Sequence, residues 1–343
     1  MSVNDVIGKL KGQRQFIDVD LPILGDWEPP VPQSEIVLVG VYPGKIYRST
    51  DSGVTWDDGH TLGDSVYSFL DYGGGVVFAG GEKKVFKSID YGETWDSGTQ
   101  IDGDRTINDI KAFADGTLVA SHTGNDGYYS TVIAYSTNQG VNWSLGSQDP
   151  SITLAGARSL VVSGSVSAFA VCGNSTLLAS IRETSDKGES WTEFQAPSYY
   201  VRGRGVFPNT LVKSGSAYLL GTDGTWSEPE TLHRSADGMN TWTAISLEDD
   251  WTIERLFTFS AGRVIASASG GYYRSMDEGA TWGSFIPTND YYAPYFIETS
   301  NGVLLMGHPN GVARSDDFGE TWSDFVSLGG YFTGPFALVS QED

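Results

Sequence analysis

The 343-residue chain is 39% apolar and 13% aromatic, enough for a sizeable core, and its single cysteine excludes an intrachain disulfide. A formal net charge of −22 repels phosphate backbones and anionic lipids, so we expect no nucleic-acid partner. No run of about 18 apolar residues is present, so no membrane insertion is predicted either.

Residues 1–34 are predicted to form an extended, proline-rich N-terminal arm. Its prolines, Pro22, Pro29, Pro30 and Pro32, favour extended chain over a strand. Its apolar side chains are too many for an inert linker: Phe16, Ile17, Leu21, Ile23, Leu24 and Trp27. We expect the arm to dock on another protein, and docking on its own chain is the alternative. No apolar core of a signal peptide is visible, so a virion or cytoplasmic location is expected.

The stretch "KIYRSTDSGVTWDDG" (45–59) follows a first apolar run, "EIVLVGV" (35–41), and recurs along the chain. The copies share the pattern Ser/Thr-x-Asp-x-Gly-x-Thr-Trp and lie 39 to 51 residues apart. Their Asp positions are Asp51, Asp90, Asn138, Asp186, Asp237, Asp277 and Asp317. Their tryptophans are Trp56, Trp95, Trp143, Trp191, Trp242, Trp282 and Trp322. Two copies deviate, since the third has Asn138 for the Asp and the fifth has its glycine one place early, at Gly238.

The residue types of the motif indicate a hairpin corner. Ser49 and Asp51 are suited to bonding nearby backbone amides, and Gly53 to a positive φ. Thr55 and Trp56 are predicted to start the next strand, with the indole covering the hairpin. Because seven equivalent copies cannot all be one active site, we interpret these residues as structural, and we predict no metal site and no cofactor.

This pattern resembles the Asp-box, or BNR repeat, of sialidases, sortilin-type receptors, xyloglucanases and a photosystem assembly factor. The resemblance implies a β-propeller with each box between the third and fourth strands of a blade. It indicates the fold strongly and the activity weakly, because one fold hosts many functions.

The second repeat illustrates four predicted strands, A to D: 65–72, 75–80, 84–89 and 94–98. The run at 35–41 is then a strand B whose blade lacks a strand A, and "FALVS" (336–340) is a strand A without a blade. We therefore predict an all-β, seven-bladed propeller over 35–343 with an Asp-box in every blade. The C-terminal strand 336–340 joins the first blade and closes the ring, which removes exposed sheet edges.

The resemblance places the D–A loops on the face opposite the boxes. Aromatic residues and arginines recur just before strand A in four successive repeats. The candidate ligand-binding residues are Tyr199, Tyr200, Arg202, Arg204, Trp251, Arg255, Tyr291, Tyr292, Tyr331 and Phe332. They either pack between blades or form a platform for a glycan or a protein surface. Two longer B–C loops, 121–131 and 221–231, are predicted to wall the same face.

Binding without catalysis is the predicted function, with no catalytic residue assigned. One form of it is a virion structural, decoration or host-attachment protein held by its N-terminal arm. The alternative is a glycoside hydrolase on the same face. A sialidase-like enzyme would need an arginine grip and a Tyr–Glu pair, and no such pair is evident. A xyloglucanase-like enzyme would need two carboxylates facing each other across a cleft.

Overall fold

The computed structural model describes residues 35–101, 105–124, 132–146, 157–165, 167–172, 180–194, 210–221, 232–247, 252–288, 292–309, 311–330 and 334–341. They all belong to one compact unit, Ser34–Asp343. The predicted arm, residues 1–34, lies outside the described residues. Of these residues, none forms an α-helix, and no helix among them could cross a bilayer.

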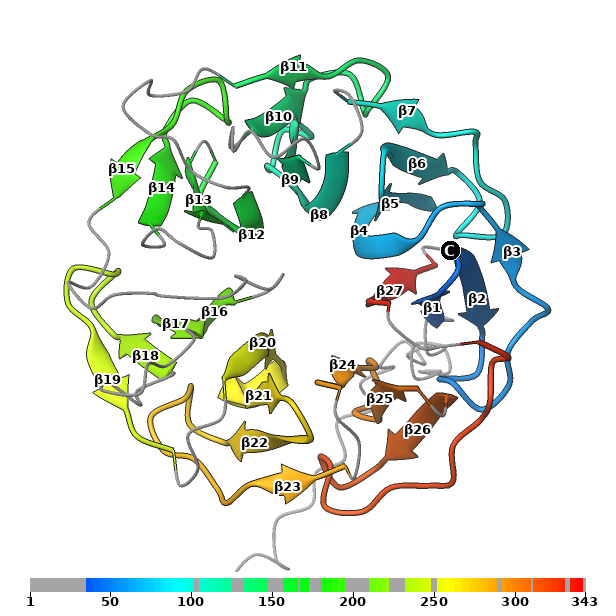
Figure 1. Cartoon of the computed structure of the whole chain (residues 1–343), viewed down its shortest axis with the longest axis vertical. Helices are drawn as coiled ribbons and strands as arrows, with labels where there is room; N and C mark the ends of the chain where they lie inside the picture. The colour runs from blue at the N-terminus through cyan, green and yellow to red at the C-terminus, as the bar shows by residue number, and fades with distance from the viewer. Residues whose placement is uncertain are drawn as a thin grey trace, which may run out of the picture. The chain divides into compact units, whose positions relative to one another are not determined.

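The described strands form antiparallel sheets arranged as blades in a ring (Figure 1). The four-stranded sheets, each given from its inner to its outer strand, are β27 (Phe336–Ser340), β1 (Glu35–Val41), β2 (Lys45–Ser49) and β3 (His60–Thr61); β4 (Val66–Gly73), β5 (Val76–Gly81), β6 (Lys84–Ser88) and β7 (Thr99–Gln100); β8 (Arg105–Ala112), β9 (Leu118–Gly124), β10 (Val132–Ser136) and β11 (Ser144–Leu145); β12 (Ala157–Ser163), β13 (Ser167–Cys172), β14 (Ser180–Thr184) and β15 (Thr192–Phe194); β16 (Leu211–Ser214), β17 (Ala217–Gly221), β18 (Leu232–Ser235) and β19 (Thr243–Ile245); and β20 (Ile253–Thr258), β21 (Val264–Ala268), β22 (Gly271–Ser275) and β23 (Ile286–Pro287). The remaining sheet has three strands, β24 (Tyr295–Glu298), β25 (Leu304–His308) and β26 (Gly311–Ser315). One short 3₁₀ turn, η2 (Ser260–Gly262), joins β20 to β21.

The prediction of seven complete blades is wrong. The described strands form six complete, four-stranded blades, and the last repeat contributes a sheet of only three strands. An outer fourth strand is absent from that sheet because the residues after Trp322 meet β26 through one isolated bridge, Val312 with Val326. Residues 323–327 are all exposed, so no buried face holds them in a regular ladder.

The two ends of the described chain pair with each other. β27 is antiparallel to β1, with Glu35 opposite Ser340 and Val39 opposite Phe336. The pairing of 336–340 with the first apolar run is therefore present as predicted, and it joins the first blade to the end of the chain.

The core lies mostly between neighbouring blades. Strands in the middle of each blade are buried on both faces, as in β1 and β21, and therefore carry continuous apolar runs. Leu38 and Ile46 of one blade, for example, share a cluster with Val77 and Phe86 of the next. Blade-to-blade packing thus holds the ring together.

Each copy of the motif folds into the same corner, here called the repeat turn, after the third strand of its sheet. In the first copy, Ser49 Oγ donates to Asp51 Oδ1 (2.8 Å) and accepts from Gly53 N (2.9 Å). Thr55 N and Oγ1 donate to the two carboxylate oxygens of Asp51 at 2.8 and 2.6 Å. The bond from the Ser or Thr hydroxyl to the third motif residue is present in the other six copies.

The deviating copies keep this corner by substitution. The amide oxygen of Asn138 accepts from Ser136 Oγ at 3.0 Å and from Asn142 N at 2.9 Å, as an Asp would. In the fifth copy Met239 takes the place of the glycine, with φ of 70° and its N–H bonded to Ser235 Oγ. The Met239 side chain is buried with Ile181 and Leu211.

The tryptophans lie in the corner itself. Contrary to prediction, Thr55 and Trp56 do not start the outer strand, which begins at His60. In three copies the indole N–H closes the turn by donating to the motif glycine carbonyl: Trp95 to Gly92, Trp191 to Gly188 and Trp282 to Gly279, at 3.0 to 3.2 Å. The ring then packs between blades, as Trp95 does against Phe69.

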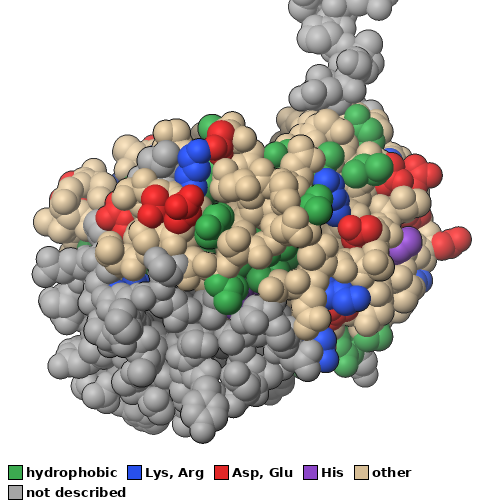
Figure 2. All heavy atoms as spheres, turned by 90° about the horizontal axis from the view of Figure 1, so that it is seen from above, with side chains coloured by type: hydrophobic (Ala, Val, Ile, Leu, Met, Phe, Trp, Pro, Cys, Tyr) green, Lys and Arg blue, Asp and Glu red, His purple; other side chains and the backbone are tan. Residues whose placement is uncertain are grey.

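The face seen from the side in Figure 2 carries acidic and basic side chains interspersed among small apolar groups. Large exposed apolar residues on the repeat turns occur singly, as at Ile89, Val141 and Met276. Such scattered residues are ordinary on a protein surface and do not identify a site.

Candidate functional site

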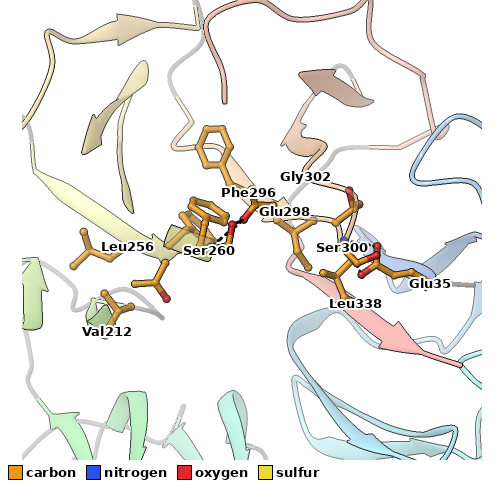
Figure 3. A pocket seen from close by; sticks show the side chains of 14 residues that line it. Glu35, Val212, Leu256, Ser260, Phe296, Glu298, Ser300, Gly302 and Leu338 are labelled. Carbon is orange, nitrogen blue, oxygen red and sulfur yellow. Dashed lines mark hydrogen bonds between the residues drawn. The ribbon is translucent and has the colours of Figure 1, made fainter. Parts of the chain in front are cut away.

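A hollow of about 550 Å³ lies at the centre of the ring, between innermost strands of several blades. Figure 3 shows its lining side chains directed into the central space. The lining comprises Glu35, Val212, Leu256, Phe257, Thr258, Phe259, Ser260, Phe296, Ile297, Glu298, Thr299, Ser300, Gly302 and Leu338. Its volume is within the range of about 300–1,000 Å³ typical of small-ligand sites.

The wall of the hollow is mainly apolar. Strand alternation explains this: Ile297 of β24 and Leu338 of β27 are half-buried, while their neighbours Phe296 and Val339 are buried in the cores on either side. Val212 of β16 adds a further aliphatic side chain. The innermost strands therefore present aliphatic and aromatic groups to the ring centre.

Two carboxylates lie among these apolar groups, and the first is neutralised from within the protein. Glu298 forms an ion pair with Arg263 and accepts from Ser260 N at 3.0 Å and Ser260 Oγ at 2.9 Å. Its side chain is only 8% exposed. The Arg263 guanidinium also stacks over Phe318, 4.5 Å from the ring centroid. Both Glu298 oxygens are therefore occupied.

The second carboxylate, Glu35, begins β1. Its two oxygens accept from the backbone N–H of Ser300 at 3.0 and 2.8 Å. The residues are 265 positions apart and meet only because the ends of the chain close the ring. Glu35 is bonded to a backbone amide and carries no ion pair in the part of the chain that the structure describes.

The hollow opens on the face of the repeat turns. Its Ser260 and Ser300 belong to turns between the first and second strands of their sheets. Repeat turns contact such inner turns directly, since Tyr91 N donates to Gly75 O at 2.9 Å and Glu278 N to Gly262 O at 2.7 Å. Sequence reasoning directed the search to the opposite face, so it missed this hollow.

The candidate residues of the opposite face fall mostly outside the described residues. These are Tyr199, Tyr200, Arg202, Arg204, Trp251, Tyr291, Tyr331 and Phe332, together with most of the two longer loops. The structure brings the other two near each other: Arg255 Nη1 donates to the carbonyl of Ala293, the neighbour of Tyr292. Arg255 also stacks on Tyr295, with Cζ 4.1 Å from the ring centroid, whereas Tyr292 is 63% exposed.

The repeat-turn carboxylates are locked in hydrogen bonds. Bonds from Thr241 lower the pKa of Asp237 to about 2. Burial alone would raise the pKa of Asp51, but bonds from Thr55 and Ser49 outweigh it and lower the pKa below its ordinary value. They stay ionised at neutral pH and serve as acceptors for the turn. No cluster of His, Cys, Asp and Glu suited to a metal ion is present within the described ranges.

Comparisons with known proteins place the chain by its fold. No family model and no curated protein matches the sequence. Among solved structures it is similar to YCF48 bound to D1 peptide, with 18% identity over 76% of this chain and 80% of that one and a TM-score of 0.57. It is also similar to the GH74 enzyme of Niastella koreensis, with 16% identity over 88% of this chain and 58% of that one and a TM-score of 0.53. A third similar structure is the WD40 β-propeller domain of Doa1, with 13% identity, 78% and 83% coverage and a TM-score of 0.53. At these identities the likeness shows the β-propeller fold alone.

Proposed function

We propose that this propeller is a non-enzymatic binding module that holds a segment of a protein partner in the central hollow. The observation that carries the proposal is the hollow itself, with apolar walls formed by Val212, Ile297 and Leu338 and polar groups at their margin. Apolar walls with a few polar groups are the usual composition of a binding site. The YCF48 structure contains a bound peptide, which supports the idea that a propeller of similar fold accommodates one.

The state of the carboxylates favours binding over hydrolysis. A glycosidase needs one carboxylic acid to donate a proton and a second carboxylate to attack or to activate water. Glu298 is instead engaged by Arg263 and Ser260, and Glu35 accepts from Ser300 N with both oxygens. Catalysis would require breaking these contacts, whereas binding leaves them intact.

The test is to fill the hollow. Peptides are selected from a random phage-displayed library on the full chain, and their affinities are measured for Thr258→Trp, an exposed hollow residue. The control is Thr61→Trp, an equally exposed position on the outer strand β3. We expect the first variant to abolish binding and the second to retain it. Peptides that bind both variants equally would overturn the proposal.

Glycan binding is the other outcome to be examined. The chain is applied to a glycan array, and any hit is incubated with the protein to measure release of reducing sugar. Turnover of a hit, lost in Glu298→Gln, would replace the binding proposal with a glycoside hydrolase.

Display on a particle with residues 1–34 as an anchor is a separate part of this proposal. It is tested by deleting residues 1–34 and measuring incorporation into purified particles. Particles that lack the full-length chain, or that retain the truncated one, would contradict it.

A further inference from the structure

The charges around the hollow are unequally balanced. Two carboxylates line it, and its lining contains no lysine, arginine or histidine. Arg263 lies just behind the wall and pairs with Glu298, so it offsets one of the two negative charges. The charge on Glu35 is left without a cation among the residues that the structure describes.

Glu35 is also fixed in position. Its two bonds to Ser300 N hold the carboxylate at the closing seam of the ring, and Figure 3 shows it beside Ser300 and Leu338. An ionised carboxylate has about four acceptor sites. One backbone N–H leaves capacity for a further donor from a ligand.

We infer that the hollow takes a lysine or arginine side chain of the partner segment, with its aliphatic stem on Leu338 and Ile297 and its cation at Glu35. This inference rests on the proposed function. Long basic side chains combine an apolar stem with a charged head, and this matches an aliphatic wall that ends in a carboxylate. A charge-assisted hydrogen bond at that carboxylate is stronger than a neutral one.

The whole-molecule charge points the same way. At a net charge of −22 the surface attracts basic segments and repels acidic ones. That attraction is diffuse and acts on any cation, so the experiment has to separate it from a specific contact at Glu35.

The probe is n-hexylammonium, with 1-hexanol as its uncharged analogue, titrated into methyl-labelled full-length protein. The methyl NMR signals of Ile297 and Leu338 report occupancy of the hollow. We expect saturable shifts with hexylammonium, and about tenfold weaker binding of hexanol and of hexylammonium to Glu35→Gln. The control Glu93→Gln removes the same charge from an exposed repeat-turn residue and is expected to leave the affinity unchanged.

Two failures are distinguishable. If hexanol binds as tightly as hexylammonium and Glu35→Gln has no effect, the cation preference is wrong while the hollow still binds ligands. If neither probe shifts Ile297 or Leu338 and the library yields no peptide sensitive to Thr258→Trp, the proposed function fails as well.

Discussion

Arg274 Nη1 donates a 2.7 Å hydrogen bond to the carbonyl oxygen of Phe318, which belongs to the repeat turn of the next blade. The same relationship recurs around the ring: Arg48 bonds to Tyr91, Lys87 to Gln139 and Arg234 to Glu278. Each acceptor has a positive φ, and each donor directly precedes the Ser of its own motif. The repeat turn therefore fastens neighbouring blades together as well as closing its own hairpin.

Arg274→Met should lower the free energy of unfolding by about 1.5–3 kcal/mol, because it removes a charge-assisted bond between blades. The matched control is Arg314→Met at the same position of β26, where Arg314 Nε is buried without a partner. We expect the control to cost less in urea denaturation. Equal losses at both positions would contradict a specific role for the inter-blade bond.

Ser275→Ala should destabilise the protein by about 1–3 kcal/mol, because the hydroxyl bonds both Asp277 and the N–H of Gly279. Ser275 is 1% exposed, so its loss leaves that amide N–H unsatisfied away from water. The exposed Ser284→Ala serves as the control in the same denaturation series. An unchanged stability for Ser275→Ala would show that the turn holds without its hydroxyl.

Gly92→Ala should be more damaging than Gly63→Ala, although both residues have φ near 80°. Strain at positive φ costs about 1–3 kcal/mol at either site. At Gly92 an added Cβ would also lie 2.7 Å from two methyl carbons of Leu38 in the preceding blade, whereas nothing lies within 4 Å at Gly63. Thermal melting of the two variants separates the steric term from the strain, and similar melting temperatures would argue against tight packing at Gly92.

Acid should weaken the repeat turns. The pKa of Asp237 is about 2 in the folded chain, lowered from 3.8 by hydrogen bonds from Thr241. A depressed carboxyl pKa contributes stability that is present above about pH 4 and is lost as the pH falls toward 2. Asp237→Asn should therefore flatten the melting temperature between pH 4 and 2, compared with wild type and with the exposed Asp58→Asn. An unaltered slope in Asp237→Asn would contradict this assignment.

The sequence by itself determined the local geometry and the order of the strands. Ser49, Asp51 and Gly53 are close along the chain, so their spacing was sufficient to predict the turn that they form. The pairing of 336–340 with 35–39 also followed from counting strand-like runs. These features depend on backbone propensity and on periodicity, which a single sequence displays.

Only the tertiary structure decided the blade count and the hollow. Val312 and Val326 make a single bridge where a full outer strand was predicted, because strand pairing depends on burial that the motif does not encode. Glu35 and Ser300 meet across 265 residues, and Val212 and Leu338 contribute from separate blades. Their sequence neighbours carry no signal of this meeting, because closure of the ring is what places the innermost strands around one axis.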